Sequence, residues 1–232
     1  FSTESIPEGK LPSHVRTLFA PTSDATFRKP DSGLRSAIMA LDEHGHQPAM
    51  LILDTAFVSD GIYTSPKGYL NTLFAKTHTA GGLCVADEVQ GGFGRIGQHF
   101  WGFQFDDAIP DIVTLGKPMG NGHPLAAVVT RPEIAEILAN ETGYFNTFGG
   151  NPVSCAAGLA VLEVIEKEAL QQNAIKVGQY LKQRLAILQR DYPVIGSLHG
   201  SGLLLGIDIL EPDGAPSPEM AAHIMNHMRE NG

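Results

Sequence analysis

The chain has 232 residues, of which 43% are hydrophobic and 18% charged, a composition that can bury a core of ordinary globular size. Its formal net charge is −9 and no lysine or arginine cluster accompanies it, which argues against nucleic acid as a partner because phosphate contacts need a local basic face. No apolar run reaches the roughly 18 to 20 residues that a membrane span needs, and no targeting signal is visible, so we expect a soluble, cytoplasmic protein.

Prolines punctuate the first part of the chain, which predicts connecting structure ahead of a short helix over residues 31–44. These prolines are Pro7, Pro12, Pro21 and Pro30. Strand-like apolar runs then alternate with helical stretches, and such alternation predicts βαβ units and a largely parallel sheet. The predicted strands cover residues 49–53, 83–86, 111–115 and 125–129, and the predicted helices cover residues 66–80 and 131–140.

Asn151 and Pro152 supply a capping side chain and a first-turn proline for a long amphipathic helix. Its apolar stripe comprises Val153, Ala156, Ala157, Ala160, Val161, Val164 and Ile165. A second helix runs to about residue 190, followed by a strand at 203–209, a loop at 211–218 and a helix at 219–230. We therefore expect residues 1–165 to form part of a large α/β domain, and residues 166–232 a connecting helix and the start of a small α+β domain.

An acid ends the second strand-like run, in Val85-Ala86-Asp87-Glu88-Val89-Gln90. A carboxylate at the carboxyl end of a parallel strand lies where α/β sheets build their ligand crevices. There it could pair with the protonated nitrogen of a pyridine ring, which turns the ring into an electron sink. Taken alone, Asp87 is better explained as a turn cap, with Glu88 facing solvent.

A lysine follows the third strand-like run, between Gly116 and Pro118. Burial beside an apolar strand and a cationic ring would favour the neutral amine, which can form an imine and move a proton. Taken alone, Lys117 is better explained as an exposed turn lysine. An apolar run ending in Asp-Glu is also typical of P-loop nucleotide hydrolases, but these need a G-x-x-x-x-G-K-[ST] phosphate loop, and Asp111 and Pro118 break that pattern here.

A third motif, residues 144–152, combines glycines, the Thr147 hydroxyl and a helix N-terminus, which together could bind a phosphate. A loop with a helix cap explains the same residues. The two cysteines, Cys84 and Cys155, lack metal-like spacing, and we expect both to be buried free thiols. His123 could line a cleft or make a loop hydrogen bond. We expect no metal site.

Segments 86–95, 110–117 and 145–152 resemble class III aminotransferases, which are pyridoxal 5'-phosphate (PLP) enzymes of fold type I, in order and spacing. The resemblance implies a three-layer α/β large domain that binds PLP, with a mostly parallel sheet. It also implies a homodimer with shared active sites. The implied roles are pyridine-nitrogen pairing for Asp87, ring packing for Val89, a bond to the ring hydroxyl for Gln90, the internal aldimine for Lys117, and contact with the neighbouring subunit's cofactor phosphate for Thr147.

Within that family, residues 99–101, 116–124 and 144–155 are most similar to the phospho-lyases of ethanolamine phosphate and phosphohydroxylysine. The resemblance therefore implies a primary amine or amino acid as substrate, with either transamination or phosphate elimination as the outcome. Two departures stand out: the family's upstream phosphate loop and ring-stacking aromatic residue do not occur in this sequence, and Asp54-Thr55 stands where Glu-Pro or Glu-Ser is common. We expect the chain to be about half of a longer protein. The alternative is a catalytically inactive fragment that serves only as a structural or dimerisation unit.

Overall fold

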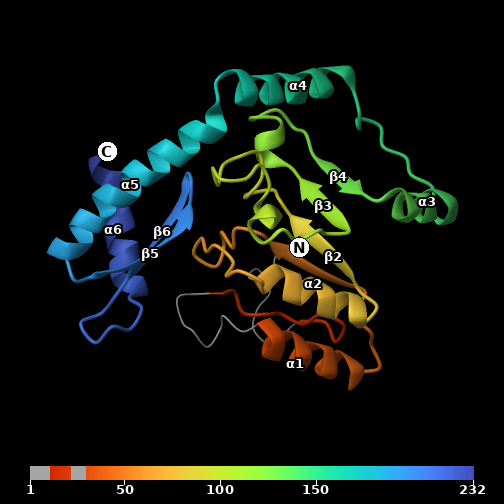
Figure 1. Cartoon of the computed structure of the whole chain (residues 1–232), viewed down its shortest axis with the longest axis horizontal. Helices are drawn as coiled ribbons and strands as arrows, with labels where there is room; N and C mark the ends of the chain where they lie inside the picture. Colours follow the sequence, from red (N-terminus) through yellow and green to blue (C-terminus); the bar gives the residue numbers. More distant parts are fainter. Residues whose placement is uncertain (1–10, 22–29) are drawn as a thin grey trace.

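The computed structural model describes residues 11–21 and 30–232 (Figure 1), so Pro7 and the rest of residues 1–10 and 22–29 lie outside the described part. The helices are α1 (Pro30–Asp42), α2 (Tyr69–Thr79), α3 (Pro132–Glu141), α4 (Pro152–Lys167), α5 (Leu170–Asp191) and α6 (Pro218–Asn231), with short 3-10 turns η2 (Gly102–Asp106) and η3 (Lys117–Met119). The strands are β1 (Met50–Asp54), β2 (Leu83–Asp87), β3 (Ile112–Leu115), β4 (Ala127–Thr130), β5 (Ile195–Ser201) and β6 (Leu204–Ile209). None of the helices in these residues is long and apolar enough to cross a bilayer.

The four-stranded sheet has the order β1-β2-β3-β4. The first three strands are parallel and β4 runs antiparallel to β3. The predicted mixed α/β fold with a mostly parallel sheet is confirmed. Because β1, β2 and β3 point the same way, their carboxyl ends meet at one edge, where Asp54 and Thr114 are the register partners of Asp87.

The main core lies between this sheet and helices α1 and α2, which pack together on one face (Figure 1). Helix α2 contributes Tyr69, Leu70, Leu73 and Phe74, which are buried against Cys84 and the partly buried Leu51 and Leu53. Side chains alternate along a strand, so Met50 and Ile52 of β1 point to the opposite face, where they are exposed. This core fixes the strands whose ends carry the site.

The C-terminal part consists of α5, the antiparallel β5–β6 hairpin and α6, with α4 leading into it (Figure 1). Strand β5 was not predicted from the sequence, because Gly196, His199 and Gly200 interrupt its apolar pattern. The division into residues 1–165 and 166–232 stays a prediction.

Helix α4 begins as predicted, since Asn151 Oδ1 accepts a hydrogen bond from the Ser154 N–H at 3.0 Å and Pro152 occupies the first turn. The apolar stripe predicted for α4 is only partly covered: Ala157, Val161 and Ile165 are partly buried, whereas the other members of the stripe are exposed on this helix. Its buried residues in the structure are Ser154 and Gly158, whereas Val153 is exposed. Small side chains bring this helix close to the neighbouring loop, whereas several larger aliphatic ones, such as Leu159, are exposed.

Candidate active site

Asp87 lies at the carboxyl end of β2, as predicted, between Asp54 on β1 and Thr114 on β3. Its Oδ1 accepts the Val89 N–H at 3.0 Å. Its Oδ2 forms no hydrogen bond with any residue that the structure describes. The Thr114 hydroxyl is also buried without a partner among those residues. The sheet edge therefore presents a carboxylate oxygen that can accept a hydrogen bond from a ligand.

Lys117 follows β3 directly and begins the turn η3. Its backbone φ is +21°, at the margin of the left-handed region that residues other than glycine seldom adopt. Its ammonium forms no ion pair or hydrogen bond within the described ranges. The preceding Gly116 packs on Val89, whose Cγ2 would be 3.5 Å from a β-carbon added to that glycine. Val89 and Lys117 therefore flank the same edge.

Asp54 connects these groups electrostatically. Burial raises the pKa of the Asp54 carboxyl, and the negative charge of Asp87 raises it further. The N–H groups of Ala56 and Val58 and the positive charge of Lys117 act in the opposite direction and lower this pKa. Both charged groups therefore lie within electrostatic reach of Asp54. Its two oxygens accept the Ala56 and Val58 N–H groups, each at 2.9 Å, so Asp54 caps the turn after β1.

Glu88 is fully buried, so the expectation that it faces solvent is wrong. Its carboxylate accepts hydrogen bonds from the Thr55 hydroxyl at 2.9 Å and from the N–H groups of Gly102 at 2.8 Å and Phe103 at 3.0 Å. Burial raises its pKa despite these three donors. Glu88 thus joins the ends of β1 and β2 to η2, directly beneath Asp87.

The alternation of side chains along a strand is the signal that could have revealed this role. If Asp87 points to the ligand side of the strand end, its neighbour Glu88 must point to the other side, into the protein. The network also requires glycine at position 102, because a β-carbon added there would lie 2.1 Å from the Thr55 Oγ1 and clash with it.

Gln90 is partly buried, three residues beyond the end of β2. Thr147, in contrast, lies in an exposed segment between α3 and α4, at the periphery of the molecule (Figure 1). Three aromatic side chains of this segment are also exposed: Tyr144, Phe148 and Phe145, the last at 90%. Within one chain, Asp87, Val89 and Lys117 come together, whereas Thr147 projects from the surface.

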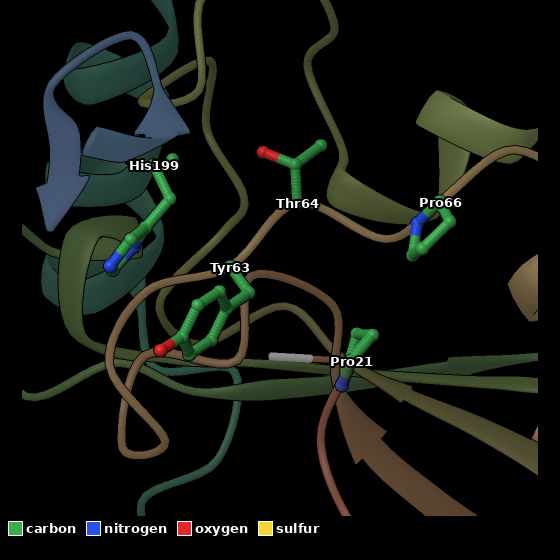
Figure 2. Close-up of a pocket in the computed structure, with 6 residues that line it drawn as sticks. Pro21, Tyr63, Thr64, Pro66 and His199 are labelled. Carbon is green, nitrogen blue, oxygen red and sulfur yellow. The ribbon is translucent and has the colours of Figure 1, made fainter. Parts of the chain in front are cut away.

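A hollow of about 290 Å³ lies between the segment after β1 and the β5–β6 hairpin. Figure 2 shows Pro21, Tyr63, Thr64, Pro66 and His199 around it. The Tyr63 and His199 rings stack at 4.3 Å, and His199 also contacts Asp208 at 3.1 Å. This hollow does not include Asp87 or Lys117. We place the candidate site at the sheet edge, because Lys117 lies there with the Asp87 Oδ2, an acceptor that no described residue uses.

One group of potential metal ligands, His78, Cys84 and Asp111, occurs in the described residues. Asp111 already accepts hydrogen bonds from the Cys84 N–H and His78, both at 2.7 Å, and pairs with Arg131 at 3.0 Å. Burial raises the pKa of the Cys84 thiol to about 12, which disfavours the thiolate that binds metals. The hydrogen bonds of Asp111 thus explain why these three side chains lie close together. Cys84 is buried as predicted, whereas the prediction that Cys155 is buried is wrong, because α4 turns it outward.

Comparison with known proteins places these residues in a wider context. Residues 8–232 match the family model described as aminotransferase class-III. The chain is 51% identical over 152 residues to the mitochondrial alanine–glyoxylate aminotransferase 2 of Homo sapiens, covering 66% of the chain and 30% of the relative. It is 44% identical over 189 residues to an alanine–glyoxylate aminotransferase 2-like protein of Drosophila melanogaster, covering 80% and 38%.

Solved structures are similar over more of the chain. A phospholyase from Arthrobacter, in complex with phosphoethanolamine, superposes with a TM-score of 0.88 at 38% identity and covers 95% of the chain and 55% of its own. An aminotransferase from Bacillus anthracis has a TM-score of 0.77 at 30% identity, covering 87% and 47%. The chain therefore spans about a third of the length of the curated relatives and about half of these structures.

Proposed function

The chain belongs to the class III aminotransferase family, and from that membership we propose that it provides the lysine and ring-binding part of a PLP-dependent enzyme. The substrate would be a primary amine or an amino acid. The observation that carries the proposal is the sheet edge, where the Asp87 Oδ2 and the Lys117 ammonium, neither with a partner among the described residues, lie at neighbouring strand ends.

The residues present fit the cofactor. Asp87 Oδ2 can accept a hydrogen bond from a protonated pyridine nitrogen, since no described group occupies it. Val89 would pack on the ring, and Gln90 would bond the ring hydroxyl. Lys117 would hold the cofactor aldehyde covalently. When bound, PLP supplies an electron sink for a carbanion next to the substrate nitrogen.

Lys117 then has a second role, because its freed amine can take up and return the substrate α-proton. The carboxylates of Asp54 and Asp87 bring negative charge to this edge, which suits a cationic ring. The hydrogen bonds of the buried Glu88 hold the ends of β1 and β2 and the turn η2 together.

We propose a homodimer in which Thr147 contacts the cofactor phosphate of the partner subunit. The exposed segment between α3 and α4 supports this arrangement, because its aromatic side chains lie uncovered at the periphery of one chain. Large exposed aromatic groups are typical of surfaces that a partner covers.

The reaction could end in transamination or in phosphate elimination, since both begin with the same roles for Asp87 and Lys117. The similarities point both ways, to alanine–glyoxylate aminotransferases and to a phospholyase solved with phosphoethanolamine. Incubation of the holoenzyme with phosphoethanolamine separates the two, because elimination releases inorganic phosphate whereas transamination does not.

The cofactor proposal has a direct spectroscopic test. We expect the protein to develop the absorbance band of lysine-bound PLP, Lys117→Ala to lose it, and Lys67→Ala, which removes an exposed lysine, to retain it. A wild-type protein that takes up no PLP would instead support the alternative, a structural or dimerisation unit without catalysis.

A further inference from the structure

His123 makes a hydrogen bond that joins two loops of the candidate site. It belongs to the lysine loop, residues 116–124, and its Nε2 lies 2.7 Å from the Oγ of Ser154 in the first turn of α4. The Ser154 residue is only 6% exposed. The bond therefore crosses 31 residues of chain in a place that water reaches poorly.

The connection continues beyond Ser154 into the aromatic loop, residues 143–151, which carries Thr147. The Asn151 side-chain amide donates to the Ser154 Oγ and to the Phe148 carbonyl, each at 2.8 Å. The Asn151 Oδ1 in turn accepts the Ser154 N–H at 3.0 Å. A continuous chain of hydrogen bonds thus runs from His123 to Phe148, next to Thr147.

The packing of α4 points to the same contact independently. Ser154 and Gly158, four residues apart and hence on one face, are the buried residues of this helix. A β-carbon added to Gly158 would lie 2.7 Å from Leu125 Cδ2 and 3.7 Å from the Met119 carbonyl oxygen. Helix α4 therefore packs on the lysine loop through two small residues, and the hydrogen bond to His123 fixes the orientation of the helix on this loop.

The donors and acceptors balance when His123 is neutral. The Ser154 Oγ accepts from Asn151, so its own proton is free to be donated to an unprotonated Nε2 of His123. The Ser154 hydroxyl and the Asn151 side-chain amide then have partners for all their donors, as groups in a buried network require.

We propose that His123 is a positioning residue, which fixes the aromatic loop, and with it Thr147, relative to Lys117 through Ser154 and Asn151. The functional part of this inference rests on the proposed PLP enzyme. Because Thr147 would serve the partner's cofactor, the connection joins the lysine loop of one active site to the phosphate contact of the other.

Hydrogen exchange tests the connection without any cofactor. The amides of Phe148 and Gly149 donate to the Asn146 side chain at 3.1 and 2.9 Å, so their exchange reports on order in the aromatic loop. We expect His123→Leu and Ser154→Ala each to speed this exchange by about 3- to 10-fold, the effect of one net hydrogen bond. The double variant should be no faster than either single variant.

Matched controls are His223→Leu on α6 and Ser36→Ala on α1, which remove exposed side chains and should leave the loop unchanged. His123→Gln should restore slow exchange, because its side-chain oxygen can accept from Ser154 in place of the ring nitrogen. Ser154→Ala and His123→Gln keep the test decisive if His123→Leu does not fold. Unchanged exchange in Ser154→Ala, or additive effects in the double variant, would overturn the proposal.

PLP titration tests the functional part. We expect the Kd of PLP to rise by a similar factor of about 3 to 10 in Ser154→Ala, with the same absorbance band as the wild type. An unchanged Kd with faster loop exchange would restrict His123 to a structural role. If the wild type takes up no PLP, the proposed function fails. The hydrogen-exchange results still decide whether the hydrogen bonds from His123 to the aromatic loop order that loop.

Discussion

Replacing Glu88 tests whether the carboxyl edge of the sheet is held together from beneath. In Glu88→Ala, the buried Gly102 N–H and Thr55 hydroxyl and the partly buried Phe103 N–H lose their acceptor. Each unsatisfied buried group costs about 1–3 kcal/mol. Removal of a carboxylate whose burial is itself unfavourable offsets part of this loss. We expect the free energy of unfolding to fall by about 2–4 kcal/mol.

Glu88→Gln separates hydrogen bonding from volume. The amide keeps one acceptor oxygen but turns an NH2 group toward one of the backbone donors, so we expect a loss of about 1–3 kcal/mol. Urea unfolding measures the free energies, and Glu136→Gln on the exposed face of α3 is the matched control, with a change within about 0.5 kcal/mol. If Glu88→Gln unfolds at the same urea concentration as this control, the three hydrogen bonds do not support the site.

The pH dependence gives a second check on Glu88. Its folded-state pKa is raised above the ordinary 4.5, so the unfolded state ionises first as the pH rises. The stabilising contribution is fully present below 4.5 and declines as the pH rises through the raised pKa. The stability difference between wild type and Glu88→Gln should therefore be larger near about pH 4 than near about pH 7.

Three further predictions address other parts of the chain. Burial raises the pKa of Asp111, but its hydrogen bonds and the nearby cations outweigh burial, so the pKa is lowered in the folded protein. Asp111→Asn should therefore destabilise the protein at pH values above 3.8, the ordinary pKa of this carboxyl. That difference should vanish as the pH falls through the lowered pKa, which thermal unfolding across pH can measure. Gly178→Ala would place a β-carbon 2.0 Å from the Gly202 carbonyl oxygen and should cost about 1–3 kcal/mol in urea unfolding, whereas Gly33→Ala meets no atom within 4 Å and should be neutral or gain up to about 1 kcal/mol. Asp87→Asn should abolish turnover with an unchanged far-UV spectrum, and normal turnover would contradict its role as partner of the ring nitrogen.

Local sequence patterns predicted much of the fold, because the strands of the main sheet are short apolar runs bounded by turns. Helix α4 also began where Asn151 and Pro152 indicated. Strand β5 was missed because its glycines and His199 resemble a turn. The packing of α4 was missed because periodicity identifies apolar residues, whereas close approach to the lysine loop depends on small ones such as Ser154 and Gly158.

The candidate site was likewise only partly predictable from the sequence. Asp87 and Lys117 could be placed from the sequence, since each follows an apolar strand and parallel strands end at one edge. The alternation of side chains could also have indicated that Glu88 is buried, but not its partners Thr55 and Gly102, which are distant in sequence and nonspecific in type. The contact between His123 and Ser154 depends likewise on how two loops pack, which no local pattern contains.

The measurement that tests the central claim most directly is chemical trapping of PLP on the protein. Borohydride reduction of the PLP-loaded protein, followed by proteolysis and mass spectrometry, should find the pyridoxyl group on the peptide that contains Lys117. The label should be absent from Lys117→Ala and present in Lys67→Ala. A label on another lysine, or none on the loaded wild type, would contradict the assignment of this sheet edge as the PLP site.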